Sequence, residues 1–243
     1  MKSKVLLIGG SGELGSAIIR SKIFKNLDSP KKKKLNLLKK SSINKFLKKK
    51  YNLIINCAAM ARMKECENKP NKAVQVNIVG TLNLVKAIKN HDQKIKLIHI
   101  STDAVYPSVE GNHSENSKLK PYNTYGWTKL CSEFIVKKLE NYIIIRTRFF
   151  NKTNIRFDTA ATDIFTSMIE IQSLVKEIKT ILSTDYIGTI NIGAKRKSDF
   201  HNYKKYKSTI KPCKRKDIIK NLNFKIAKDA SMSLNLLKKI KRR

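Results

Sequence analysis

The chain has 243 residues, with 52 Lys and Arg against 18 Asp and Glu, and a net charge of +34. A hydrophobic content of 41% is enough to build a core, which excludes a wholly disordered chain. The excess charge lies at the two ends, +13 in residues 1–50 and +13 in residues 201–243. Only nine of the cations are arginine, the residue best suited to phosphate and guanine. We therefore expect no specific nucleic-acid partner.

The distribution of Cys and His residues predicts no metal site and no disulfide framework. The four cysteines and four histidines are scattered, without a C-x-x-C pair. The apolar run at residues 5–8 is too short for a signal peptide, and no stretch approaches the roughly 18 apolar residues of a membrane span. We expect a cytoplasmic protein with no membrane partner.

Short apolar runs along the chain are typical of strands buried on both faces of a parallel sheet. In chain order they are residues 5–8, 53–57, 97–101, 142–146 and 189–192. Helical spacing lies between them, at residues 14–23, 74–88 and 125–139, and returns in the tail near 198–206 and 234–240. This alternation predicts an α/β protein with a doubly wound parallel sheet, a Rossmann fold.

We expect two regions in the chain. Residues 1–148 would form the Rossmann core. Residues 149–243 would contain the last strand of the sheet, at about 189–193, and a small C-terminal lobe, because the pattern weakens between residues 149 and 163.

A glycine-rich turn follows the first strand, in the pattern G-x-x-G-x-x-G. Gly9 permits a tight turn out of the strand, Gly12 lets the backbone approach a pyrophosphate, and Gly15 lets helix and strand pack closely. The helix that begins there directs its N-terminus at the phosphates. The context of strand, glycines and amphipathic helix predicts a dinucleotide-binding turn.

The choice between NAD and NADP stays open, with a slight preference for NADP. An acidic residue about 20 positions after the turn would bind the ribose of NAD, and Asp28 is the candidate. The four lysines at 31–34 could instead accept the 2′-phosphate of NADP.

A Y-x-x-x-K pair predicts acid–base chemistry. Tyr125 and Lys129 would share one face of a helix, and a lysine ammonium beside a phenol lowers the pKa of the phenol. Such a tyrosine can exchange a proton with a carbinol oxygen while hydride moves at carbon. Thr102 ends the preceding strand and brings a hydroxyl to the same edge of the sheet. A second such pair, Tyr203 and Lys207, lies in the basic tail without a comparable partner, and we interpret it as a coincidence.

Several stretches together resemble the extended short-chain dehydrogenase/reductases, and within them the dTDP-4-dehydrorhamnose reductase-like, sugar-nucleotide-binding family. The matching stretches occur in the family's order and cover about residues 3–148. They are residues 7–15, 55–59, 76–77, 99–106, 121–130 and 144–147.

The resemblance implies roles for matching positions. Thr102, Tyr125 and Lys129 would be the catalytic residues. Tyr125 and Lys129 would also bind the cofactor, Lys129 at the nicotinamide ribose. The cofactor, NADP or NAD, would further contact the glycine turn, a pair of residues beside the adenine and a loop beneath the cofactor; these residues are Gly9, Gly12, Glu13, Leu14, Gly15, Asn36, Leu37, Ala58, Ala59 and Met60. The implied enzyme is an NAD(P)H-dependent reductase of a nucleotide-linked 4-keto-6-deoxy sugar, in surface-polysaccharide precursor synthesis.

The chain also departs from the resemblance. Family reductases are usually some tens of residues longer, and much of the missing length falls between Phe149 and Asp163, where a helix of the substrate lobe would be expected. Two alternatives therefore stay open: a nucleotide-sugar epimerase or dehydratase, and a non-catalytic NADP-binding regulatory subunit. A dehydratase would usually want acidic groups after the catalytic threonine; Asp103 is present, but no Glu follows it. A homodimer is also left open.

Overall fold

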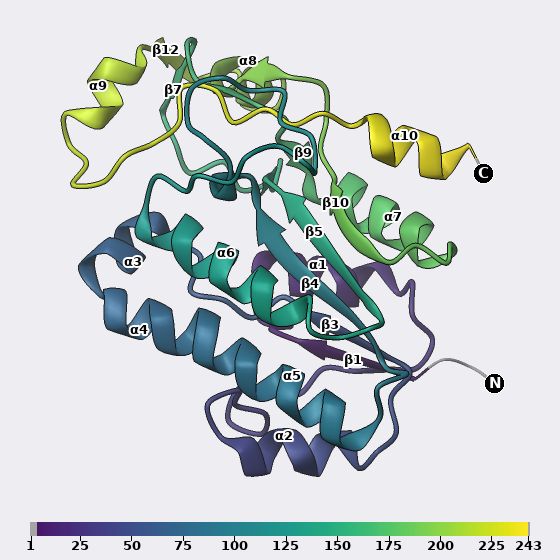
Figure 1. Cartoon of the computed structure of the whole chain (residues 1–243). Helices are drawn as coiled ribbons and strands as arrows, with labels where there is room; N and C mark the ends of the chain where they lie inside the picture. The colour runs from purple at the N-terminus through teal and green to yellow at the C-terminus, as the bar shows by residue number, and fades with distance from the viewer. Residues whose placement is uncertain (1–3, 243) are drawn as a thin grey trace.

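The computed structural model describes residues 4–242 and is built on one six-stranded sheet (Figure 1). The strand order is β10-β5-β4-β3-β1-β2, and every neighbouring pair is parallel. The strands are β1 (Val5–Ile8), β2 (Leu27–Asp28), β3 (Leu53–Asn56), β4 (Lys96–Thr102), β5 (Tyr142–Thr147) and β10 (Gly188–Asn191). This confirms the predicted doubly wound Rossmann fold, with β1 at the point where the strand order reverses.

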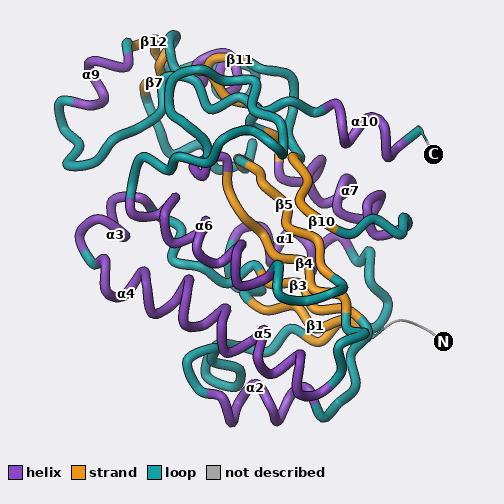
Figure 2. Tube along the Cα trace, in the orientation of Figure 1, coloured by secondary structure: helices purple, strands orange, loops and turns teal. Residues whose placement is uncertain are grey.

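Helices cover both faces of the sheet (Figure 2). On one face α1 (Glu13–Ser21) packs beside α7 (Ile171–Leu182). On the other face lie α2 (Lys40–Leu47), α5 (Gly80–His91) and α6 (Thr124–Val136). Two short helices, α3 (Met63–Asn68) and α4 (Pro70–Val74), and one π-helical turn, Gln75–Val79, lead into α5. Among residues 4–242, the helices are all too short or too polar to serve as membrane spans.

The strands are apolar without interruption because both of their faces are buried. Successive side chains of a strand point to opposite faces. Leu7 accordingly packs in the core cluster beneath α1 and α7, and its neighbour Leu6 in the cluster beneath α2 and α5. Ile145 and Ile144 of β5 divide in the same way. The continuous apolar runs in the sequence therefore reflect a hydrophobic core on both faces of the sheet.

A smaller region lies at the carboxyl ends of β4 and β5. It contains three two-stranded pairs and two helices, and its own apolar cluster includes Phe150, Met168 and Tyr203. In Figure 1 its labels β7, β12, α8 and α9 lie at the top of the view, beyond the β4 and β5 arrowheads. The pairs are β6 (Phe149–Phe150) with β9 (Ile169–Glu170), β7 (Thr159–Ala161) with β12 (Lys211–Cys213), and β8 (Phe165–Thr166) with β11 (Lys197–Ser198); the helices are α8 (Asp199–Lys204) and α9 (Arg215–Ile219). The last helix, α10 (Asn235–Lys241), instead packs against β10 and α7 and adds Leu237 to the main core.

Candidate active site

The glycine turn after β1 has no room for a side chain at two of its positions. Gly9 has a φ of +87°, and a Cβ there would lie 2.6 Å from the backbone nitrogen of Ala58. A Cβ on Gly15 would lie 2.3 Å from the carbonyl oxygen of Gly9. Gly12 is different: it caps α1, and the nearest atom to a Cβ there is 3.4 Å away. The turn therefore holds the start of α1 against the ends of β1 and β3.

Glu13 and Leu14, the next two predicted residues, point in different directions. The Glu13 carboxylate pairs with Arg156 at 3.4 Å, and both side chains are about half exposed. The Leu14 side chain is buried in the core beneath α1. Leu14 can therefore offer only its backbone to a ligand at the turn.

Asn36 and Leu37, predicted beside an adenine, lie on the α2 side of the sheet. The Asn36 Oδ1 accepts a hydrogen bond from the Leu38 backbone N–H at 3.0 Å, which shapes the local turn. The Leu37 side chain is buried and packs in the cluster with α2 and α5. Asn83 on α5 donates to the Leu37 carbonyl at 2.9 Å and fixes the segment to that helix.

The loop after β3 carries Ala58, Ala59 and Met60 and is fixed by two amides. The Asn56 Oδ1 accepts from the Ala58 N–H at 3.1 Å. The buried Asn77, in the π-helical turn, accepts from the Met60 N–H at 2.8 Å, donates to the Met60 carbonyl at 3.0 Å and donates to Thr128 of α6 at 2.9 Å. The loop is thereby tied to α6.

Thr102, Tyr125 and Lys129 come together at the carboxyl end of β4. The Thr102 hydroxyl caps a short 3₁₀ turn, accepting from the Ala104 N–H at 3.2 Å and donating to Asp103 at 3.1 Å. The Tyr125 side chain, at the start of α6, lies beside this hydroxyl. Lys129 lies one turn later on α6, and only 1% of its surface is exposed. Three residues far apart in the sequence thus share one site.

Burial dominates the protonation of this site. It raises the pKa of Tyr125, with the charge of Asp103 acting in the same direction and the neighbouring Thr102 hydroxyl opposing both. The sequence predicted a lowered pKa for this phenol, and the direction is corrected here because desolvation outweighs the neighbours. Burial also lowers the pKa of Lys129 to about 8, against the opposing charges of Glu133 and Cys57. Tyr125 therefore keeps its proton at neutral pH.

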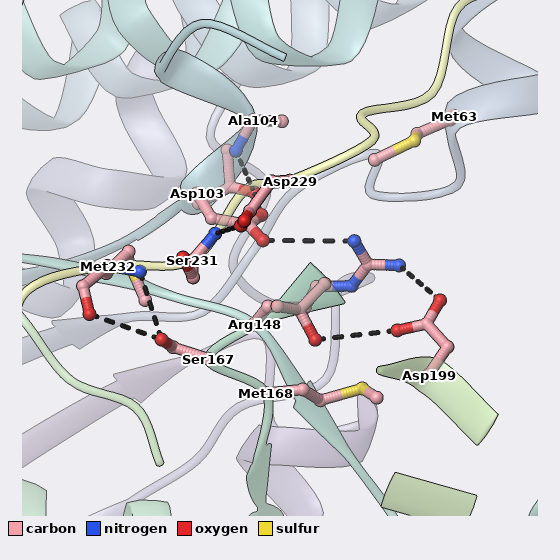
Figure 3. Close-up of polar contacts among 12 residues, drawn as sticks. Met63, Asp103, Ala104, Arg148, Ser167, Met168, Asp199, Asp229, Ser231 and Met232 are labelled. Atoms are coloured by element: carbon pink, nitrogen blue, oxygen red, sulfur yellow. Dashed lines mark hydrogen bonds and ion pairs between the residues drawn. The ribbon is translucent and has the colours of Figure 1, made fainter. Parts of the chain in front are cut away.

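An arginine between two carboxylates adjoins this site (Figure 3). Arg148, just after β5, lies 3.9 Å from Asp103 and 3.7 Å from Asp199 at the start of α8. Burial raises the pKa of both acids, and the guanidinium opposes that rise. Arg148 and Asp199 were not predicted, because neither belongs to a sequence motif and only the fold brings them together.

No metal centre is visible in the described part of the chain. Residues 4–242 bring together no group of three or more His, Cys, Asp or Glu side chains that could hold an ion. The site's polar groups are a hydroxyl, a phenol, an amine and the arginine–carboxylate cluster.

Curated relatives match parts of this chain. The dTDP-4-dehydrorhamnose reductase of Mycolicibacterium smegmatis is 38% identical over 96 residues, which is 38% of this chain and 29% of that protein. The UDP-glucose 4-epimerase of Mycoplasma genitalium is 30% identical over 179 residues, 62% of this chain and 53% of that protein. The chain thus spans about a third to a half of the curated relatives that it matches.

A solved structure and a family model cover more of the chain. The dTDP-4-dehydrorhamnose reductase of Bacillus anthracis in complex with NADP superposes with a TM-score of 0.87 at 23% identity, over 98% of this chain and 92% of that one. At this identity the likeness concerns the fold. The model of the RmlD substrate binding domain matches residues 3–181, most of the chain. With its Rossmann sheet and glycine turn, the chain belongs to the RmlD substrate-binding domain family.

Proposed function

We propose that this chain is an NAD(P)H-dependent reductase of a nucleotide-linked 4-keto-6-deoxy sugar, acting in the cytoplasm in the synthesis of surface-polysaccharide precursors. The observation that carries the proposal is the meeting of Thr102, Tyr125 and Lys129 at one edge of the sheet. The reductase named among the curated relatives supports the same reaction class.

The chemistry follows from the state of Tyr125. A phenol that keeps its proton at neutral pH is the form that a general acid needs. NADPH, when bound, supplies the hydride that adds to C4 of the sugar. Tyr125 donates its proton to the C4 oxygen while Thr102 donates a hydrogen bond to that oxygen, so the ketone becomes an alcohol. The phenolate then regains a proton from solvent.

The glycine turn fits a dinucleotide. Gly12 is exposed at the N-terminus of α1, and a Cβ on it would extend into the space where the pyrophosphate has to approach. Glu13, Leu14 and the segments at Asn36–Leu37 and Ala58–Met60 would complete the cofactor site. We assign cofactor binding to residues 1–148 and sugar-nucleotide binding to the lobe within 149–243.

We favour NADP over NAD. The Asp28 carboxylate, the candidate ligand for an NAD ribose, accepts a hydrogen bond from Tyr51 and lies 3.6 Å from the Lys49 ammonium, so it already has partners within the protein. The side chain beside the turn is instead Ser29: a Cβ on Gly10 would come within 2.0 Å of its hydroxyl. A neutral hydroxyl there leaves room for a 2′-phosphate. The similar Bacillus anthracis structure contains NADP.

Two glycine substitutions should separate cofactor binding from folding. Gly12→Ala is expected to weaken NADPH binding at least tenfold while lowering the unfolding free energy by less than about 1 kcal/mol, the usual scale of a cap change. Gly15→Ala, whose Cβ meets backbone, is expected to lower the unfolding free energy by about 1–3 kcal/mol. NADPH fluorescence titration and urea unfolding measure the two effects. Equal effects of the two substitutions on stability would contradict this account of the turn.

The proposed activity is tested with purified protein, NADPH or NADH, and a panel of nucleotide-linked 4-keto-6-deoxy sugars. We expect cofactor to be consumed, with formation of the 4-hydroxy sugar, and faster with NADPH. Interconversion of sugars without net cofactor use would favour an epimerase, the activity named for the Mycoplasma genitalium relative. Cofactor binding without turnover of any sugar would favour a regulatory subunit.

A further inference from the structure

Arg148 adjoins the catalytic edge of the sheet, yet the proposed chemistry does not use it. It directly follows Thr147, the residue that pairs with Thr102 in the register of β5 and β4. Its side chain reaches between Asp103 and Asp199 (Figure 3), and 29% of that side chain is exposed. The guanidinium is therefore open to a molecule bound at Thr102.

The guanidinium lies between two carboxylates without a hydrogen bond to either. Its Nη1 is 3.9 Å from the Asp103 Oδ2, and its Nη2 is 3.7 Å from the Asp199 Oδ2. Both separations are too long for a direct N–H···O hydrogen bond. A hydroxyl between the two atoms can accept from the nitrogen and donate to the carboxylate, whereas an anion can only accept. The two sides of the guanidinium therefore suit two hydroxyls of one ligand.

Two buried polar atoms near Arg148 have no hydrogen-bond partner among residues 4–242. They are the Asp103 Oδ2 and the Tyr122 hydroxyl oxygen. Only 1% of Asp103 is exposed, and a buried polar atom without a partner destabilises the protein. Burial raises the pKa of Tyr122, with the charge of Asp103 acting in the same direction and that of Arg148 opposing it, so this phenol keeps its proton and can donate it. A ligand with several hydroxyls would give both atoms a partner, and an apolar ligand would not.

The order of these groups fits successive oxygens of a sugar ring. We assign the C4 oxygen to Thr102, whose hydroxyl lies 3.1 Å from the Asp103 Oδ1. The C3 hydroxyl then falls between Asp103 and Arg148, and the C2 hydroxyl between Arg148 and Asp199. We propose that Arg148, with Asp103 and Asp199, binds the C2–C3 diol of the sugar and makes the enzyme select 4-keto-6-deoxy sugars that retain both hydroxyls. This inference rests on the proposed function, because the reaction at C4 places the sugar against Thr102.

The selection can be measured in the unaltered protein by calorimetry in the presence of NADP. The probes are dTDP-rhamnose, its 2-deoxy analogue and its 3-deoxy analogue. We expect Kd to be at least about tenfold higher for each analogue, the scale of a lost hydrogen bond to a charged group. In steady-state kinetics, kcat/KM for the corresponding 4-keto sugars should fall by a similar factor. Equal Kd values for the three sugars would overturn the inference.

Arg148→Lys keeps a positive charge between the two acids but replaces the planar fork by a single ammonium. We expect Kd for dTDP-rhamnose to rise about tenfold and Kd for the two analogues to change much less, so the protein no longer distinguishes the three sugars well. The control is Arg196→Lys, because the Arg196 Nε already donates to Asp229 at 2.8 Å; this variant should distinguish the sugars as the unaltered protein does.

Equal weakening of all three sugars in Arg148→Lys would indicate a purely structural arginine and overturn the inference. Full discrimination retained in that variant would also overturn it, and a protein that still reduced 4-keto sugars would leave the proposed reductase standing. The expected discrimination in binding, by a protein that consumes no NADPH with any 4-keto sugar, would instead overturn the reductase alone.

Discussion

Tyr125→Phe is expected to lower kcat for NADPH-dependent sugar reduction by about 10²–10⁴-fold, the usual contribution of a general acid. The substitution removes the one hydroxyl that we assign to protonating the C4 oxygen and leaves the ring in place on α6. Affinity for NADPH should change little, because the glycine turn that we assign to the pyrophosphate is untouched. Steady-state kinetics and fluorescence titration measure the two quantities.

The second Y-x-x-x-K pair supplies a matched control. Tyr203 is buried, but its hydroxyl faces the Met168 sulfur at 3.5 Å, and Lys207 pairs with Asp158 at 2.9 Å. Tyr203→Phe should leave kcat close to that of the unaltered protein. If the two substitutions reduced kcat equally, the assignment of Tyr125 as the general acid would be wrong.

Glu133→Ala is expected to lower the unfolding free energy by about 3–5 kcal/mol, because it leaves a buried guanidinium without its partner. Glu133 and Arg146 are each 1% exposed, and their ion pair is 2.7 Å long. The same carboxylate accepts from Ser101, and Arg146 donates to Tyr106 at 2.9 Å. Urea unfolding followed by circular dichroism measures the loss.

The exposed ion pair of Arg62 and Glu65, 3.3 Å apart, is a control for the effect of burial on the cost of losing a partner. Glu65→Ala should lower the unfolding free energy by no more than about 1 kcal/mol, because water solvates the arginine that remains. Combining Glu133→Leu with Arg146→Met should recover part of the loss, since no charge is then buried. A loss for Glu133→Ala as small as that for Glu65→Ala would contradict this account.

The sheet was largely predictable because burial on both faces leaves continuous apolar runs. Each predicted strand overlaps an observed one, with ends that differ by a residue or two. Strand β2 has only two residues, which is too short for an apolar pattern to predict it. Helix α2 lies in a lysine-rich stretch, where only Ile43 and Leu47 are buried. Helix α7 has the helical spacing of Ile171, Leu174, Val175 and Ile178, so its signal was present and was missed.

The site was predictable where residues belong to one motif, and not where the fold assembles it. The glycine turn and the Tyr125–Lys129 pair are local patterns, and their geometry follows from a strand end or a helix turn. Arg148 and Asp199 became apparent only when the end of β5 and the start of α8 were brought together. The direction of the Tyr125 pKa shift could not be predicted either. It depends on burial of the phenol, and the spacing of Tyr125 and Lys129 in the sequence does not determine that burial.

The contacts of Asn191, at the end of β10, imply an order in which parts of the chain fold during synthesis. Its side chain accepts from Tyr106 at 2.8 Å and donates to the carbonyls of His113 and Ser233, at 2.9 and 3.3 Å. One amide therefore joins three segments that leave the ribosome at very different moments. During synthesis Tyr106 has to wait for Asn191, 85 residues later, and Asn191 has to wait for Ser233, 42 residues later still. We expect the edge that carries Thr102 to become rigid last, so a nascent chain would pair the strands between Val5 and Thr147 well before it could bind a sugar.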